Sequence, residues 1–272
     1  EDNNGLALAL VMLVPFFYYL HQTSVNRWIR WGLIGSIIAI VFSILGSQSR
    51  GALLAIIAMA VVLGVKGKHF FKTSFLIAAL LVSAISFMPE SWTSRMATIQ
   101  NYDQDASAMS RLYVWQTMWN LAVDRPIVGG GFGTDTPIVF ARYAPVSVGD
   151  YEGGSVLVAH SIYFQALGEH GFPGLILFMF LGIFAWRKAA NLAKQTATDP
   201  EFMDWVPLLM RMVQVSIAGF SVGGAFLSVA YFDLPYYIIG YVVLVDATVR
   251  EREKSILETQ ADKNRIAPQQ PL

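Results

Sequence analysis

Long apolar stretches separated by short polar ones dominate the pattern of this chain. Seven stretches stand out, at residues 6–20, 31–46, 51–65, 73–88, 172–187, 207–226 and 231–246. Several are shorter than the ~20 residues that a helix needs to cross a bilayer, but flanking aromatics such as Trp28 and Trp31 can occupy the interface. The pattern therefore predicts an all-α, polytopic integral membrane protein with about seven transmembrane helices and one large periplasmic loop.

The same pattern predicts four parts. Residues 1–88 would hold transmembrane helices 1–4, and residues 89–171 a periplasmic loop with amphipathic helices. Residues 172–249 would hold helices 5–7, and residues 250–272 a polar cytoplasmic tail that we expect to be disordered. Because the chain starts at Glu1 without an initiator Met or a signal peptide, we expect a fragment that lacks upstream helices.

Composition excludes several classes of protein. Charged residues make up 14% of the chain and hydrophobic residues 55%, whereas a soluble domain has about 25% charged residues. Lys+Arg and Asp+Glu are both 19, so the chain has no basic excess to neutralise nucleic-acid phosphates. With no cysteine, it has neither a thiol nucleophile nor a thiolate metal site.

The positive charges predict the orientation. All lysines fall in the loops after the third and fifth spans and in the tail, and Arg27 and Arg30 fall in the loop after the first span. That side should therefore be cytoplasmic. The other side holds only arginines, namely Arg50, Arg95, Arg111, Arg125 and Arg142. The turn that contains Arg50 and the long loop therefore face outward.

The outward loop should contain two helices and a glycine-rich turn. Leu112, Trp115 and Trp119 recur at helical spacing within 107–123, and Pro126 lies beyond the end of that helix. The turn at 129–133 would let backbone approach a ligand. A second short helix is expected at 161–168, broken by Gly171 and Pro173, which begin the next span.

Two of the outward arginines are candidates for phosphate binding. Arg50 comes directly after Ser49 in the tightest hairpin between spans, and its planar fork can bind phosphate through two hydrogen bonds. The alternative is an arginine whose head only reaches the interface. Arg111 could lie on a solvated helix face, but Trp115 and Trp119 would bury that face, so the arginine needs an anionic partner.

His160 is the candidate acid, base or phosphate partner, although a lone histidine is usually structural or merely exposed. Glu169 would lie ~13 Å further along a straight helix, so we interpret it as supporting the glycine-rich break. His160 and His170 are ten positions apart and no HExxH motif occurs, so no metal site is predicted.

The order of these motifs resembles the C-terminal half of the bacterial O-antigen ligase and polymerase superfamily. The matching stretches are 3–7, 47–52, 111–119, 126–133 and 160–174. Within that superfamily, residues 159–174 are similar to O-glycosylation ligases associated with exosortase systems.

The resemblance implies a multi-pass enzyme of the bacterial cell inner membrane with a periplasmic active site. It would transfer a glycan from undecaprenyl diphosphate to an acceptor hydroxyl on a lipid A core sugar, a glycan or a protein, without metal or cofactor. Arg50 and Arg111 would bind the diphosphate, and His160 would be the essential histidine. Neighbouring residues expected to bind substrate are Ser49, Tyr113, Trp115, Gly131 and Tyr163.

Two alternatives stay open. A polymerase would extend a glycan on the same lipid carrier and would differ only in its acceptor. A transporter or flippase usually keeps ionisable residues or broken helices in mid-membrane. Here Arg211 and Asp246 lie near the ends of predicted spans and Pro15 is the main interruption, so transport is less favoured.

Overall fold

The computed structural model describes residues 3–47, 49–66, 106–145 and 156–266. Every regular element in these ranges is a helix, which confirms the all-α prediction. The helices are α1 (Asn3–Thr23), α2 (Arg27–Gly46), α3 (Arg50–Lys66), α6 (Ala106–Asp124), α7 (Pro137–Tyr143), α8 (Ile162–Gln195), η2 (Thr196–Thr198), α9 (Val206–Gly223), η3 (Gly224–Phe226) and α10 (Asp233–Ile266).

The apolar helices make this a multi-pass membrane protein. By length and composition, α1, α2, α8 and α9 can each cross a membrane, and α3 contains a shorter apolar helix at Gly51–Gly64. The predicted span at 73–88 lies outside the described residues, so the count of seven stays a prediction. The last span was predicted to begin at residue 231, but α10 begins two residues later, at Asp233, and Tyr231 belongs to the loop before it.

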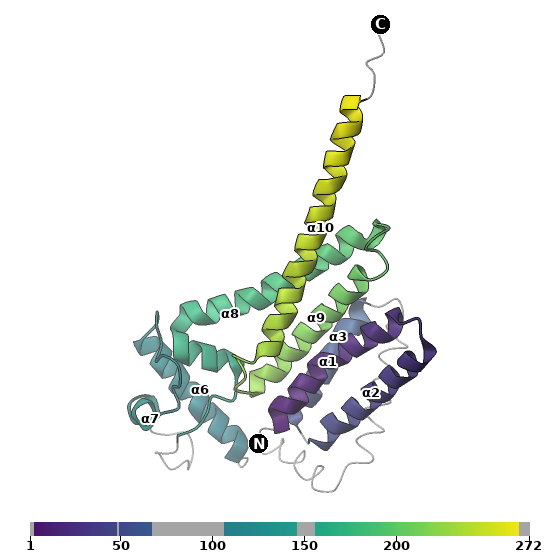
Figure 1. The fold of residues 1–272 in the computed structure, drawn as a ribbon. Helices are drawn as coiled ribbons and strands as arrows, with labels where there is room; N and C mark the ends of the chain where they lie inside the picture. Colours follow the sequence, from purple (N-terminus) through teal and green to yellow (C-terminus); the bar gives the residue numbers. More distant parts are fainter. Residues whose placement is uncertain (1–2, 48, 67–105, 146–155, 267–272) are drawn as a thin grey trace.

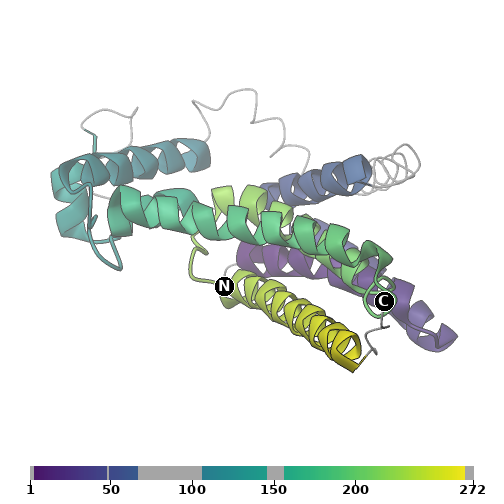
Figure 2. The same cartoon turned by 90° about the horizontal axis from the view of Figure 1, so that it is seen from above.

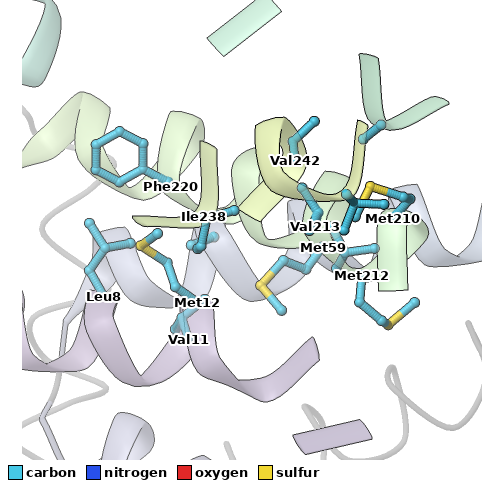
Figure 3. Packing of buried hydrophobic residues seen from close by; sticks show 14 of the residues in the cluster. Leu8, Val11, Met12, Met59, Met210, Met212, Val213, Phe220, Ile238 and Val242 are labelled. Carbon is cyan, nitrogen blue, oxygen red and sulfur yellow. The ribbon is translucent and has the colours of Figure 1, made fainter. Parts of the chain in front are cut away.

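Helix α9 is the centre of the bundle. It packs against α1, α3, α8 and α10 (Figures 1 and 2). The core that these helices share is drawn in Figure 3, where the labelled residues are Leu8, Val11 and Met12 of α1, Met59 of α3, Met210, Met212, Val213 and Phe220 of α9, and Ile238 and Val242 of α10.

Small residues let α9 approach α1 and α3 closely. A Cβ added at Gly223 would lie 2.6 Å from Leu8 Cδ1 and 3.1 Å from Ala55 Cβ, and one at Gly219 would lie 2.7 Å from Met59 Sδ. In a bilayer the lipid is as apolar as the helix surfaces, so helices associate through close van der Waals packing. The two glycines, four residues apart on one face, make that packing possible.

Buried polar side chains add hydrogen bonds between helices. Ser216 Oγ of α9 donates to the carbonyl oxygen of Met12 at 2.9 Å, and Gln214 Nε2 donates to that of Trp186 at 2.9 Å. Each bond joins α9 to a different neighbour, α1 or α8. Hydrogen bonds of this kind stabilise helix pairs where no water competes.

Helix α10 continues well beyond the bundle (Figure 1). Its Asp246 carboxylate binds Lys188 of α8 at 2.7 Å and Arg250 of its own next turn at 3.0 Å. The prediction of a disordered tail is therefore wrong for residues 250–266. This segment is rich in Glu, Lys and Arg, which favour helix, and no proline interrupts it before Pro268.

The α9 interface predicts a steric cost that depends on position. Gly223→Val should lower the free energy of unfolding by about 1–3 kcal/mol, because the added methyl groups overfill a close contact. Gly35→Val is the matched control, since a Cβ there meets no described atom within 4 Å. Thermal unfolding in detergent measures both, and equal melting temperatures would contradict the close approach.

Candidate functional site

The predicted amphipathic helix is α6, and it carries a small core of its own. Tyr113 is 2% exposed, and its ring centroid lies 5.9 Å from that of Phe140 in α7. Asn120 Nδ2 donates to the carbonyl oxygen of Tyr143 at 2.9 Å and so joins α6 to α7 again. Because Tyr113 is buried in this packing, its predicted contact with substrate stays a prediction.

Helix α8 is kinked where the sequence predicted a break. Gly171 has φ 65° and ψ −166°, so the regular helical hydrogen bonds around it are lost. Phe172 N, which would donate to Gly168 O in a regular helix, donates instead to Pro126 O at 2.9 Å. Gly168 O in turn accepts from Gly130 N at 2.8 Å.

Pro173 frees a further carbonyl, because its nitrogen has no hydrogen to donate to Glu169 O. That carbonyl accepts from Gly131 N at 2.9 Å. The glycine-rich turn therefore replaces the hydrogen bonds that the kinked helix lacks. The approach is close at Gly129, which has φ 59° and where a Cβ would lie 2.6 Å from Gly168 O.

A polar cluster surrounds this kink. The Glu169 side chain is buried, and its Oε1 accepts from Gly133 N at 3.3 Å. Its other oxygen accepts from the Tyr231 hydroxyl, which also lies 2.8 Å from His170 Nε2. The Phe132 ring packs edge-on against His170, with centroids 4.7 Å apart.

The cluster defines the donor in the contact between Tyr231 and His170. Burial, and then the hydrogen bond to Glu169, raise the pKa of Tyr231, so the phenol keeps its proton. That single proton is donated to the carboxylate, so the phenol oxygen can only accept from His170. Nε2 of His170 therefore supplies the hydrogen of this contact.

Within this cluster, the sequence predicted a structural role for Glu169 but none for Tyr231. Glu169 supports the glycine-rich break, as predicted, through its carbonyl and its side chain. Tyr231 was missed because it was counted as the start of a span. Nothing in the sequence relates Tyr231 to the kink, since the two are 60 residues apart.

The peptide unit before His160 is held from two sides. Trp115 Nε1 of α6 donates to Ala159 O at 2.9 Å, and His160 N donates to Ser228 Oγ at 2.6 Å. The Trp115 indole also stacks on Phe164, with centroids 5.0 Å apart. His160 itself has φ 46°, and it is the one non-glycine residue with positive φ in the described part of the chain.

The two arginines lie on α6 and α3, two helices that reach this region. Arg111 is half-buried on α6, one turn before Trp115. Arg50 is the first residue of α3. Ser49, just before it, is buried and accepts at Oγ from Ala52 N at 3.3 Å, so its hydroxyl caps α3.

The turn η3 brings the starts of α3 and α8 together. A Cβ added at Gly51, the second residue of α3, would lie 3.6 Å from Phe226 Cβ. Gly224 is the first residue of the same turn, and a Cβ added there would lie 2.7 Å from Ile162 Cδ1 at the start of α8. The elements that carry the predicted arginine and histidine thus pack on the same turn.

A comparison with known families identifies the class of this protein. The chain matches the family model described as O-antigen ligase over residues 35–179, which is more than half of its length. The chain belongs to the O-antigen ligase family. This confirms the resemblance to the superfamily, while the exosortase-associated subgroup stays a prediction. No curated protein matches the chain.

This O-antigen ligase domain includes all three predicted catalytic residues, because the matched range runs from α2 into α8. As a family member, the protein is a membrane enzyme of the glycosyl-transferring ligase and polymerase type. Among the described residues, no group of three or more His, Asp or Glu could hold a metal ion.

An apolar cavity of about 240 Å³ lies between α8, α9 and α10 of this ligase-family protein. Tyr163 lines it three residues after the predicted histidine and donates to Ser221 O at 2.8 Å. Phe178, Phe220 and Tyr236 line it further along. The predicted substrate contact of Tyr163 stays a prediction, but the residue does border an open space.

The contact between the glycine-rich turn and α8 predicts unequal effects at two glycines. Gly129→Ala should destabilise the protein strongly, because its Cβ would meet the backbone of residues 168–169. Gly131 also has positive φ, 83°, but a Cβ there meets no described atom within 4 Å. Gly131→Ala should therefore cost only the backbone strain, about 1–2 kcal/mol. Thermal unfolding compares the two, and equal losses would contradict the close approach.

Proposed function

We propose that the protein transfers a glycan from an undecaprenyl-diphosphate carrier to an acceptor hydroxyl at the periplasmic face of the bacterial inner membrane. The observation that supports the proposal is the convergence of α6 with the starts of α3 and α8. Trp115 joins α6 to the residue before His160, and η3 packs against the starts of both α3 and α8. Arg50, Arg111 and His160 come from these elements.

The chemistry requires positive charge and a base. The acceptor oxygen attacks the anomeric carbon, and the bond from that carbon to the diphosphate oxygen breaks. His160 takes the proton of the acceptor hydroxyl, and undecaprenyl diphosphate leaves with the bonding electrons. Arg50 and Arg111 stabilise the charge that develops on the leaving oxygen, so the step needs no metal. Attack opposite the diphosphate inverts the anomeric centre.

The apolar cavity supports a lipid-linked donor. Two of the helices that line it, α8 and α9, are long and apolar enough to span a membrane, and Tyr163 at its edge is three residues from His160. A carrier lipid with its tail in the bilayer could therefore reach the histidine without leaving the apolar phase. A transporter would instead be expected to place ionisable groups in mid-membrane. Here the half-buried pair Lys188–Asp246 joins α8 to α10 near the end of the predicted span.

A ligase and a polymerase would share this donor chemistry. Their acceptors differ, since a ligase uses a lipid A core sugar, a protein or another glycan, and a polymerase uses a second lipid-linked glycan. We favour the ligase, because the family description and the resemblance of residues 159–174 agree on it. Analysis of which molecule receives the glycan in cells distinguishes the two.

Substitution of the three predicted residues tests transfer. Arg50→Ala, Arg111→Ala and His160→Ala should each lower transfer by about 100-fold or more, since each removes a charge or a base from the reacting centre. The measurement is complementation of a gene deletion in the source bacterium. Undecaprenyl-linked glycan should accumulate in the variants, and glycan on the acceptor should be lost.

The matched control is Arg142→Ala, because this arginine is also predicted to face outward but is exposed, with an ion pair to Asp124 at 3.4 Å and a cation–π contact with Tyr143. It should leave transfer unchanged. Membrane insertion of every variant is checked by its abundance in the membrane fraction. Full transfer by His160→Ala, or unchanged lipid-linked glycan after deletion, would contradict the proposed function.

The predicted orientation can be tested separately, because the chain has no cysteine of its own. Ile138→Cys in α7 and Val25→Cys between α1 and α2 place single thiols at positions that are 81% and 99% exposed. A membrane-impermeant maleimide should label the first in intact spheroplasts, and the second only after lysis. The reverse pattern would contradict the orientation.

A further inference from the structure

We propose that Trp115 and Ser228 form a clamp on the Ala159–His160 peptide unit and act as positioning residues for the His160 side chain. The inference rests on the proposed function, in which His160 handles the acceptor proton. It adds residues from two other elements, α6 and the loop at 227–232 before α10, to the machinery of transfer.

The clamp acts on both polar atoms of one peptide unit. Ala159 O accepts from the Trp115 indole at 2.9 Å, and His160 N donates to Ser228 Oγ at 2.6 Å. A peptide unit is planar, so two bonds at its opposite ends fix the rotation of the whole plane. Stacking on Phe164 restrains the Trp115 ring itself.

The clamped plane leads directly into a strained residue. The bond from His160 N to its Cα is rotated to φ 46°, a left-handed conformation that costs energy for a residue with a side chain. Such a conformation persists only where surrounding contacts impose it. If the plane were released, the residue would relax toward negative φ, and the direction of its Cα–Cβ bond would change.

The loop that carries Ser228 is itself tied along α8. Ala230 N donates to Gln165 Oε1 at 3.1 Å, and the Tyr231 hydroxyl bonds to Glu169 and His170. Successive loop residues thus meet successive turns of the helix that begins just after His160. This arrangement holds Ser228 at a constant place relative to the histidine.

The clamp is tested by Ser228→Ala and Trp115→Phe. The first removes the acceptor for His160 N, and the second keeps an aromatic ring on Phe164 but removes the indole N–H. Both should lower kcat by about 10- to 100-fold, the effect of misplacing a reacting group by about 1 Å. KM for the donor should not change, because binding of the diphosphate is left intact.

The assay uses the full-length protein in lipid vesicles. The donor is lipid-linked glycan extracted from the deletion strain, and envelope from that strain supplies the unmodified acceptor. Release of undecaprenyl diphosphate is measured as the donor concentration is varied. Ser228→Thr should restore kcat, because it returns the hydroxyl, whereas a role in packing alone would not require one.

Two substitutions serve as matched controls. Ser36→Ala removes a hydroxyl that bonds only within its own helix, at 2.9 Å from Gly32 O. Trp119→Phe changes the next tryptophan of α6, which packs edge-on against Phe172. Both controls should keep the kcat of the unaltered protein.

Several results would contradict the clamp. Unchanged kcat in Ser228→Ala, a change in KM alone, or failure of Ser228→Thr to restore kcat would overturn the clamp. Activity lost only in proportion to a lowered melting temperature would overturn it too. His160→Ala, assayed in parallel, separates the two proposals. If that variant transfers glycan normally, the proposed function is wrong. If it loses transfer while the Ser228 and Trp115 variants stay fully active, only the clamp is wrong.

Discussion

The exchange of backbone hydrogen bonds between the glycine-rich turn and the kink of α8 is the constraint on which the arrangement of α6, α7 and the start of α8 depends. A broken helix exposes polar groups that must find partners, and lipid offers none. At Gly171 and Pro173 these partners are the N–H groups and the carbonyl of the turn after α6. The kink and the turn therefore require each other, and together they determine where α6 packs on α8.

A second constraint comes from α9, whose glycines set the distances in the bundle. Because Gly219 and Gly223 have no side chains, α1 and α3 approach closely, and η3 emerges beside the starts of α3 and α8. Interhelical hydrogen bonds from Ser216 and Gln214 fix the rotation of α9 relative to its neighbours. The geometry around η3 thus results from the close packing of α9 against its neighbours.

Much of the architecture could be predicted from local pattern. The helix at 107–123, the glycine-rich turn and the break at Gly171 are confirmed, because helical periodicity and the chemistry of glycine and proline act over a few residues. The apolar face predicted for that helix is partly wrong, since Leu112 and Trp119 are exposed. The tail was predicted wrongly, since polarity alone was taken to mean disorder. Its Arg252 pairs with Glu201 in the loop before α9, a contact between residues 51 apart in sequence that gives no local signal.

By itself, the sequence determined the class of the protein and most of its described helices, because these depend on composition and on short-range order. Only the tertiary structure decided that Trp115 and Ser228 meet at one peptide unit, and that Tyr231 joins Glu169 to His170. The physical reason is that such contacts depend on how the helices pack. A hydrogen bond between distant residues forms only when several elements have already been brought within about 3 Å of one another.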